Sequence, residues 1–385
     1  MMAKRVPLDT YCEKKIPTLQ KTYVGLIDYL DISSVDNAEK RIISYQTIRS
    51  SNAPSRAKQL LKKGDVLVST VRPNLNAVAV VEKETENLMV GSTGYCVLRC
   101  KENINVRYLF NFCQSQYFVE DMSSQATGAS YPAVSNGIVR NSLIPCYSIN
   151  EQREIAEKMD TVSELLALRK QQLVKLDELV KSRFIELFGG ADYPKVLFEN
   201  VCVFLRNGAS IKQTKGAGGY PITRIETLSN DVFNIDRLGY ADITDLEKYQ
   251  SYVLRHGDIL ISHINSVAYL GRAVQYRGQL DTPIIHGMNL LCARIADSYN
   301  PTYIEWFFKT PMAKEYISTI TKKAVNQASI TTSDLKKMQV PNPPKNLQDQ
   351  FATFVEQIDK SKLAVQQSIA ELEELKKSLM QKYFG

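Results

Sequence analysis

The chain has 385 residues, of which 44% are hydrophobic, so it is long enough to bury more than one core. It contains no run of about 18 apolar residues, which argues against a transmembrane helix. Its basic start lacks the apolar segment of a secretion signal. None of its seven cysteines forms a pair with the two-residue gap of a zinc or redox site, so we expect reduced thiols and a cytoplasmic location.

The formal net charge of +7 is distributed unevenly along the chain. Residues 1–145 carry a net charge of +5 and residues 191–342 carry +3, whereas the two remaining segments together carry −1. The basic excess therefore belongs to two blocks, which is the distribution that a polyanionic partner requires.

The first block, residues 1–145, has the pattern of a mixed α+β domain. Short apolar runs at 66–68, 77–81 and 96–98 alternate with turn residues and predict strands. Residues 108–113 (YLFNFC) predict a helix with an aromatic core face.

Residues 146–190 predict one long helix. Their apolar residues are separated alternately by three and four positions, which is the heptad pattern of a coiled coil. The helix is expected to begin after Pro145 and to end before Gly189. At 1.5 Å per residue it would be roughly 50 Å long.

The second half of the chain repeats the first. Residues 256–262 (HGDILIS) echo residues 63–69 (KGDVLVS), and residues 346–385 match residues 150–189 without a gap at eleven of forty positions. We therefore expect a second α+β block at 191–342 and a second long helix at 343–385, related to the first pair by a pseudo-twofold axis.

The two long helices most simply pair with each other as an antiparallel coiled coil, because the second block must return the chain between them. We interpret them as a spacer whose spare faces also dock partner helices. Charged residues interrupt the apolar seam at Arg169, Arg183, Lys362 and Lys376 and can set its register. The predicted seam consists of Ile155, Met159, Val162, Leu166, Leu173, Leu176, Val180, Phe351, Val355, Ile358, Val365, Ile369, Leu372 and Leu379.

The sequence offers no catalytic or metal site. Its three histidines have no partner residues at metal-ligand or nucleophile spacing. The glycine-rich residues 215–220 lack the lysine and hydroxyl of a phosphate loop. Residues 342–345 (NPPK) have a lysine where an adenine methyltransferase motif has an aromatic residue, so we interpret them as a linker.

Four segments resemble a known family. Residues 55–60 (SRAKQL), 63–80 (KGDVLVSTVRPNLNAVAV) and 91–95 (GSTGY) are similar to stretches of target-recognition domains. Residues 144–156 (IPCYSINEQREIA) are similar to the start of the helix that follows such a domain. Together with the repeat, they make the whole chain resemble the specificity (S) subunit of type I restriction–modification enzymes.

This resemblance implies a non-catalytic subunit that binds a bipartite, asymmetric site on double-stranded DNA. Each recognition domain would read one half of the site, and the two long helices would act as a ruler that sets the spacing between the halves. The second block has residues 262–265 (SHIN) where the first has 69–72 (STVR), so the two halves should differ. No membrane is implied as a partner.

The resemblance also implies the protein partners and their cofactors. Two modification subunits would dock on the chain and carry S-adenosylmethionine, and restriction subunits would carry ATP and Mg²⁺. This chain itself would bind no cofactor.

We expect polar loop residues to contact the DNA, because Lys and Arg bind phosphates and Arg, Asn and Gln form paired hydrogen bonds with base edges. The predicted phosphate contacts are Arg56, Lys58, Lys62, Lys212, Lys215, Lys322 and Lys323. The predicted base-reading residues are Arg72, Asn74, Asn76, Arg206, Asn207, His263, Asn265, Asn326 and Gln327. The loop that contains Ser130 and Tyr131 is expected to take part as well, as is its counterpart at 323–327.

Three other functions are compatible with parts of this pattern. An orphan double recognition module would bind DNA without an enzyme partner, and co-purification with a methyltransferase would argue against it. An enzyme would need a cofactor loop that the sequence lacks. A purely structural coiled-coil scaffold would leave the two basic blocks unexplained.

Overall fold

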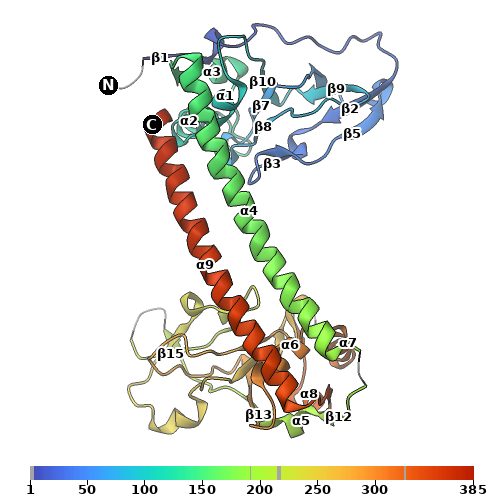
Figure 1. Cartoon of the computed structure of the whole chain (residues 1–385), viewed down its shortest axis with the longest axis vertical. Helices are drawn as coiled ribbons and strands as arrows, with labels where there is room; N and C mark the ends of the chain where they lie inside the picture. Colours follow the sequence, from blue (N-terminus) through green and yellow to red (C-terminus); the bar gives the residue numbers. More distant parts are fainter. Residues whose placement is uncertain (1–3, 191, 215–217, 325–326) are drawn as a thin grey trace. The chain divides into compact units, whose positions relative to one another are not determined.

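The computed structural model describes residues 4–190, 192–214, 218–324 and 327–385. The chain divides into two units, of which the first contains residues 1–172 with 365–385 and the second contains residues 173–364. Each long helix therefore begins in one unit and ends in the other (Figure 1). The mixed α+β class predicted from the sequence is confirmed.

The first unit contains eleven of the strands and the first helices of the chain. Its elements are β1 (Arg5–Pro7), β2 (Leu26–Leu30), β3 (Val35–Asp36), β4 (Arg41–Ile42), β5 (Gln46–Arg49), β6 (Ala57–Leu60), β7 (Val66–Ser69), β8 (Val78–Val80), β9 (Leu88–Ser92), β10 (Tyr95–Leu98), α1 (Val106–Phe112), α2 (Gln116–Ser124), α3 (Asn136–Asn141), β11 (Leu143–Pro145) and the start of α4 (Ile149–Phe188).

The first unit is built in three layers around the antiparallel sheet β10-β7-β8. Because side chains alternate along a strand, Val66 and Val68 of β7 pack toward helices α1 and α2, whereas Leu67 packs toward the second sheet, β5-β2-β9-β6. The predicted strands around residues 66–68 and 96–98 are thus the two buried neighbours β7 and β10.

The second unit repeats this plan. Its elements are β12 (Lys195–Leu197), α5 (Phe198–Val201), β13 (Cys202–Asn207), β14 (Gln213–Thr214), β15 (Tyr220–Ile222), β16 (Leu228–Ser229), β17 (Val232–Phe233), β18 (Gly239–Ala241), β19 (Ile259–Ser262), β20 (Ile264–Asn265), β21 (Ala273–Gln275), β22 (Leu290–Ile295), α6 (Pro301–Phe307), α7 (Pro311–Ile320), β23 (Lys322–Lys323), β24 (Ala328–Ser329), α8 (Thr332–Lys336), β25 (Gln339–Pro341) and the start of α9 (Lys345–Phe384).

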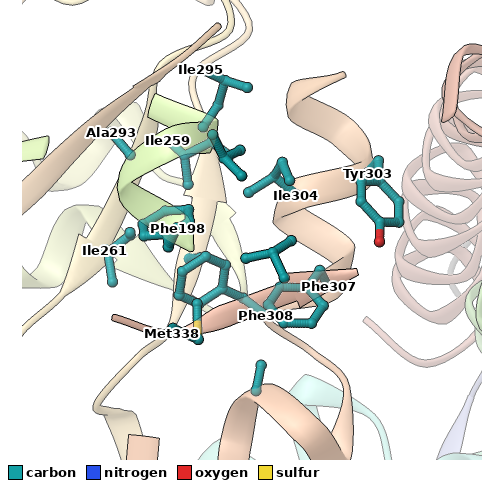
Figure 2. Close-up of a cluster of buried hydrophobic side chains, with 14 of the residues drawn as sticks. Phe198, Ile259, Ile261, Ala293, Ile295, Tyr303, Ile304, Phe307, Phe308 and Met338 are labelled. Carbon is teal, nitrogen blue, oxygen red and sulfur yellow. The ribbon is translucent and has the colours of Figure 1, made fainter. Parts of the chain in front are cut away.

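The central sheet of the second unit, β13-β22-β19-β21, packs one face against helix α6. Figure 2 shows Ile259 and Ile261 of β19 facing Ile304 and Phe307 of that helix. The opposite face of the sheet packs against Leu228 and neighbouring apolar residues. Strands β19, β22 and β21 correspond to β7, β10 and β8 of the first unit.

Helices α4 and α9 each contain 40 residues and are antiparallel to each other. In the first unit, Ile155 and Met159 near the start of α4 share a core with Phe384 at the end of α9. In the second unit, Val180 near the end of α4 shares a core with Phe351 near the start of α9. These contacts confirm the predicted antiparallel pairing.

Nine of the fourteen positions of the predicted apolar seam are buried and five are half-buried. The buried positions are Ile155, Met159, Val162, Leu166, Val180, Phe351, Val355, Ile358 and Val365. The half-buried positions are Leu173, Leu176, Ile369, Leu372 and Leu379. The interrupting charges form ion pairs in part: Lys362 lies 2.5 Å from Asp177 in the second unit. The helices are therefore held mainly by the globular cores, into which their ends insert.

A glutamine near the start of each long helix explains one of the identities in the repeat. Buried Gln152 accepts a hydrogen bond from the backbone N–H of Asn105, which caps helix α1. Gln348 accepts the same bond from Asn300, the cap of α6. Each glutamine thus fastens a spacer helix to a globular layer.

A buried ion pair also recurs in both units. Asp65 accepts hydrogen bonds from Nε and Nη2 of Arg99 at 2.8 and 2.7 Å, and Asp258 accepts the same two bonds from Arg294. Each aspartate also accepts a hydrogen bond from the backbone N–H of the residue three positions before it, which is Lys62 or Arg255. The Asp65 carboxylate raises the pKa of Arg99. The Gly-Asp motif of the repeat is therefore a structural turn.

We expect Asp65→Ala to destabilise the first unit by about 3 kcal/mol, because it leaves the buried Arg99 guanidinium without a carboxylate partner. Hydrogen exchange of the β7 amides would measure this loss. The matched control is Glu102→Ala, which removes an exposed carboxylate of the same unit. Equal exchange rates in the two variants would show that the ion pair of Asp65 with Arg99 does not stabilise the first unit.

Candidate nucleic-acid interface

One end of the central sheet of the first unit carries two adjoining loops. Strand β7 ends at Ser69, and the chain continues into the Arg72 turn, residues 70–76. Ala133 pairs with both Val71 and Thr127, so that residues 127–133 form an arm beside this turn. The backbone N–H of Arg72 donates to the Pro132 carbonyl at 2.7 Å, which fastens the turn to the arm.

The Arg72 side chain is exposed and held in place by an aromatic ring. Its guanidinium carbon lies 4.8 Å from the ring centroid of Tyr131, whose side chain is 68% exposed. The Arg72 backbone is left-handed, with φ of 49°, a conformation that costs on the order of 1 kcal/mol. Within the described part of the chain, no carboxylate pairs with this guanidinium. A free, oriented guanidinium can donate two parallel hydrogen bonds to a guanine edge or a phosphate.

The two asparagines of the turn have different environments. Asn74 is exposed. The amide of Asn76 is already used, because its Oδ1 accepts a hydrogen bond from Nζ of Lys40 and its Nδ2 donates to the Cys113 carbonyl, both at 2.8 Å. Asn76 also has a left-handed backbone, with φ of 48°. Its geometry favours a positioning role in the turn over contact with a base.

Lys40 was not predicted from the sequence and proves to support this turn. It lies between β3 and β4, and burial, followed by the nearby charge of Lys376, lowers its pKa to about 8. The only local sign of this role is its position in a turn, because its partner Asn76 is 36 residues away.

The other predicted residues of the first unit are spread over its surface. Arg56 forms an ion pair with Asp31 at 2.8 Å, and its carbonyl accepts a hydrogen bond from Thr93. Lys58 and Ser130 are exposed. Lys62 precedes the buried Asp65, so it lies at the opposite end of β7 from the Arg72 turn.

The second unit places an equivalent turn and arm after β19. Strand β20 pairs with β24, and β24 pairs with β23, so residues 322–324 and 327–329 form the arm. Lys322 lies 3.8 Å from Asp334, whereas Lys323 and Gln327 are exposed. Predicted residues Asn326 and Lys215 lie outside the described residues.

Arg206 of the second unit lies against two aromatic rings. Its guanidinium carbon lies 4.8 Å from the ring centroid of Phe204 and 4.5 Å from that of Tyr252. Its Nε is buried without a hydrogen-bond partner, and no described carboxylate pairs with the group. Exposed Asn207 follows it and pairs with Leu291, next to the end of β19. Arg206 itself lies opposite Cys292, which pairs with Leu260 in the middle of β19, so Asn207 is the residue that approaches the turn and arm.

The remaining predicted residues of the second unit are less available. The side chain of His263 is only 6% exposed, and burial lowers its pKa, so it lies beneath the surface as a neutral ring. Asn265 is half-buried and bonded to Ser262 and Ser266. Lys212 is exposed and lies 4.0 Å from Asp242.

Comparison with known proteins decides the family. The family model described as the type I restriction modification DNA specificity domain matches residues 10–178 and again residues 195–374. The chain belongs to this family.

Individual relatives of the specificity-domain family agree with this assignment. The chain is 37% identical, over 187 residues, to the putative MjaX specificity subunit of Methanocaldococcus jannaschii, covering 48% of this chain and 44% of that protein. It is 26% identical to the EcoKI specificity subunit of Escherichia coli, covering 75% and 67% of the two chains. The alignment thus spans less than half of the Methanocaldococcus protein.

Two solved structures share the fold. A chain of a type I restriction–modification system matches with a TM-score of 0.66 and 25% identity, covering 100% of this chain and 97% of that one. The S subunit from M. genitalium matches with a TM-score of 0.59 and 14% identity over 99% and 96%. The resemblance inferred from the sequence is confirmed at the level of family and fold.

The described residues contain neither a candidate metal site nor a candidate membrane-spanning helix. They contain no cluster of three or more His, Cys, Asp or Glu side chains that could hold a metal ion. No helix formed by them is long and apolar enough to span a membrane.

A second buried histidine makes the second unit of this specificity-domain chain sensitive to acid. Burial lowers the pKa of His286 to about 4, so the ring is neutral in the folded chain and its Nε2 lies 2.9 Å from the Leu290 carbonyl. Since the unfolded pKa is near 6.5, the unfolded chain binds the additional proton first as the pH falls. The stability that the neutral ring contributes is present above pH 6.5 and is lost toward pH 4.

We expect the second unit to lose on the order of 2 kcal/mol between pH 6.5 and 4, and His286→Gln to remove most of this pH dependence. Urea unfolding followed by the fluorescence of Trp306, the single tryptophan, measures the second unit, because Trp306 packs against its core. His256→Gln, at an exposed histidine, is the control. If the free energy of unfolding of wild type and of His286→Gln falls equally between pH 6.5 and 4, His286 is not the cause of the acid sensitivity.

Proposed function

We propose that the chain is the DNA-specificity subunit of a type I restriction–modification system and catalyses no reaction itself. One observation carries the proposal: each unit offers an arginine that lies against a tyrosine ring and forms no ion pair with a described carboxylate. These are Arg72 on Tyr131 and Arg206 on Tyr252. Such a group is oriented before binding, so it loses little side-chain entropy on pairing with a guanine edge.

The DNA site is bipartite and asymmetric. Residues 1–145 and 191–342 form the two recognition domains, and residues 146–190 and 343–385 form the spacers between them. The internal repeat supports two recognition domains with the same architecture. The Arg72 turn and the segment that follows β19 differ in sequence, which supports two different half-sites. The first reader uses Arg72, Asn74, Ser130 and Tyr131, and the second uses Arg206, Asn207, Lys323 and Gln327.

The partners are two modification subunits, which carry S-adenosylmethionine, and restriction subunits, which carry ATP and Mg²⁺. The long helices have apolar side chains on faces that neither globular core covers. Leu165, Leu168 and Val174 of α4 and Leu363 and Leu375 of α9 are exposed. Exposed apolar residues at helical spacing support docking of partner helices. Leu179 of α4 and Leu375 of α9 occupy equivalent positions of the repeat and are both exposed, which supports one such contact on each spacer for two identical subunits.

The test is co-expression of this chain with a type I modification subunit from the same genome, followed by base-resolution mapping of adenine methylation in host DNA. A split, asymmetric motif that disappears when this chain is omitted supports the proposal and identifies both half-sites. If the chain purifies alone and no new methylation appears, it is an orphan DNA-recognition module instead.

A further inference from the structure

An open groove of about 1150 Å³ lies in the first unit outside the Arg72 turn and its arm. Residues 18–26 line one side of it, and residues from 49 to 58 line the other. The pairing of Leu26 with Arg49 joins the two sides at one point, and a hydrogen bond from the Leu19 N–H to the Lys58 carbonyl joins them at another. The groove is therefore part of the folded sheet edge and not a gap between loose segments.

The charge in this groove has a single sign. Lys21, Arg49 and Lys58 line it, all three are exposed, and no lining residue is an aspartate or glutamate. None of these three cations forms an ion pair with a described residue, whereas nearby Arg56 is neutralised by Asp31. The remaining polar lining consists largely of hydroxyl groups, at Thr18, Thr22, Ser50, Ser51 and Ser55. Unpaired cations among hydroxyl donors are the groups that contact phosphate oxygens.

The groove is connected to the Arg72 turn by two backbone hydrogen bonds. The wall at 55–58 contains Arg56, whose carbonyl accepts the N–H of Thr93, and the next residue, Gly94, accepts the N–H of Thr70. Strand β6 pairs with β9 so that Ala57 lies opposite Ser92. Both features therefore lie beside the same short turn, residues 92–94.

We propose that this groove binds the sugar–phosphate backbone of the DNA that flanks the first half-site. The inference rests on the proposed DNA-specificity function and adds to it a contact that is independent of base sequence. A duplex that reaches Arg72 continues past its half-site, and the groove supplies three cations beside that point. An acidic segment of a protein partner is the competing occupant. The DNA backbone is favoured because the groove shares the turn at 92–94 with the proposed base-reading residue.

The decisive variant is Lys21→Gln/Arg49→Gln/Lys58→Gln in the full chain, co-expressed and assembled with its methyltransferase. A matched control, Lys63→Gln/Lys83→Gln/Lys101→Gln, removes the same charge from the first unit. These three lysines are exposed, and they lie beyond the Val66, Val80 and Leu98 ends of the central strands, opposite the Arg72 turn. Fluorescence anisotropy with labelled duplexes would give affinities from 50 to 300 mM salt, for the mapped motif and for a scrambled sequence.

Each phosphate contact contributes about 0.9 to the slope of log affinity against log salt. We therefore expect the groove variant to lower that slope by about 2 to 3 for both duplexes and to leave the methylated motif unchanged. At 0.15 M salt its affinity should fall on the order of a hundredfold, while the control changes little. Trimming the duplex beyond the first half-site should lower the wild-type slope but not that of the variant.

Several outcomes would overturn the inference. One is a groove variant whose salt slope equals that of the control. Another is normal DNA binding by the assembled variant together with weakened assembly, which would assign the groove to a protein partner. Wild-type protein that does not prefer the mapped motif would instead refute the proposed function. Circular dichroism and hydrogen exchange of the β7 amides establish that the first unit is folded in both triple variants.

Discussion

Replacing Arg72 by alanine is expected to relax recognition of one half of the DNA site and to leave the other half intact. A paired contact between a guanidinium and a guanine contributes about 1–3 kcal/mol of discrimination, which corresponds to roughly 5- to 150-fold in affinity. The turn should keep its shape, because its fastening to the arm uses the backbone N–H of Arg72 and not the side chain. Methylation mapping would then show a motif in which the bases of one half are relaxed.

Arg206→Ala is the matched variant, because Arg206 has the same stacked and unpaired guanidinium in the other unit. It should relax the opposite half of the motif. Tyr131→Phe keeps the ring beneath Arg72 and should leave recognition close to that of the wild type. Equal losses at both halves in either arginine variant would contradict a model with one reader per unit.

Removing one heptad from both long helices, residues 167–173 of α4 and residues 363–369 of α9, is expected to change the number of unread base pairs between the half-sites. The deletion shortens each helix by about 10 Å, which corresponds to about three base-pair steps. If the helices set the spacing, the methylated motif should keep both half-sites and lose up to about three base pairs between them. Deleting whole heptads preserves the apolar seam, since the same face is presented after seven residues.

The control for this deletion removes five residues from the same region, which rotates the two parts of the seam by about 140° relative to each other and should destabilise the chain. If the folded heptad-deletion variant keeps the same number of base pairs between the half-sites, the helices do not set that spacing.

Sequence patterns predicted the features that depend on local spacing. The heptad seam and the strands around 66–68 and 96–98 were recognisable from short patterns, and each corresponds to an observed element. Both partners of the buried ion pair are hydrophilic, and Asp65 pairs with an arginine 34 residues away, so the ion pair itself could not be predicted.

The environment of individual side chains was much harder to predict. Asn76 and His263 both follow a central strand and are suitable for reading bases by residue type. In the fold, the side-chain amide of Asn76 accepts a hydrogen bond from Lys40, and the His263 ring is buried. Arg206, by contrast, is distinguished by Tyr252, which is distant in sequence and stacks on it. Long-range packing decides which polar groups remain free.

The insertion of Phe384 into the first unit has a consequence for how the protein is made. Its ring lies 5.3 Å from Tyr108 and 5.9 Å from Phe112, and it is fully buried in the core that begins at Leu8. On a ribosome, the amino-terminal unit therefore emerges with an unfilled aromatic cavity and must wait for more than two hundred further residues before it can close. Until then, its partly folded state is exposed to aggregation and is a natural client for a chaperone.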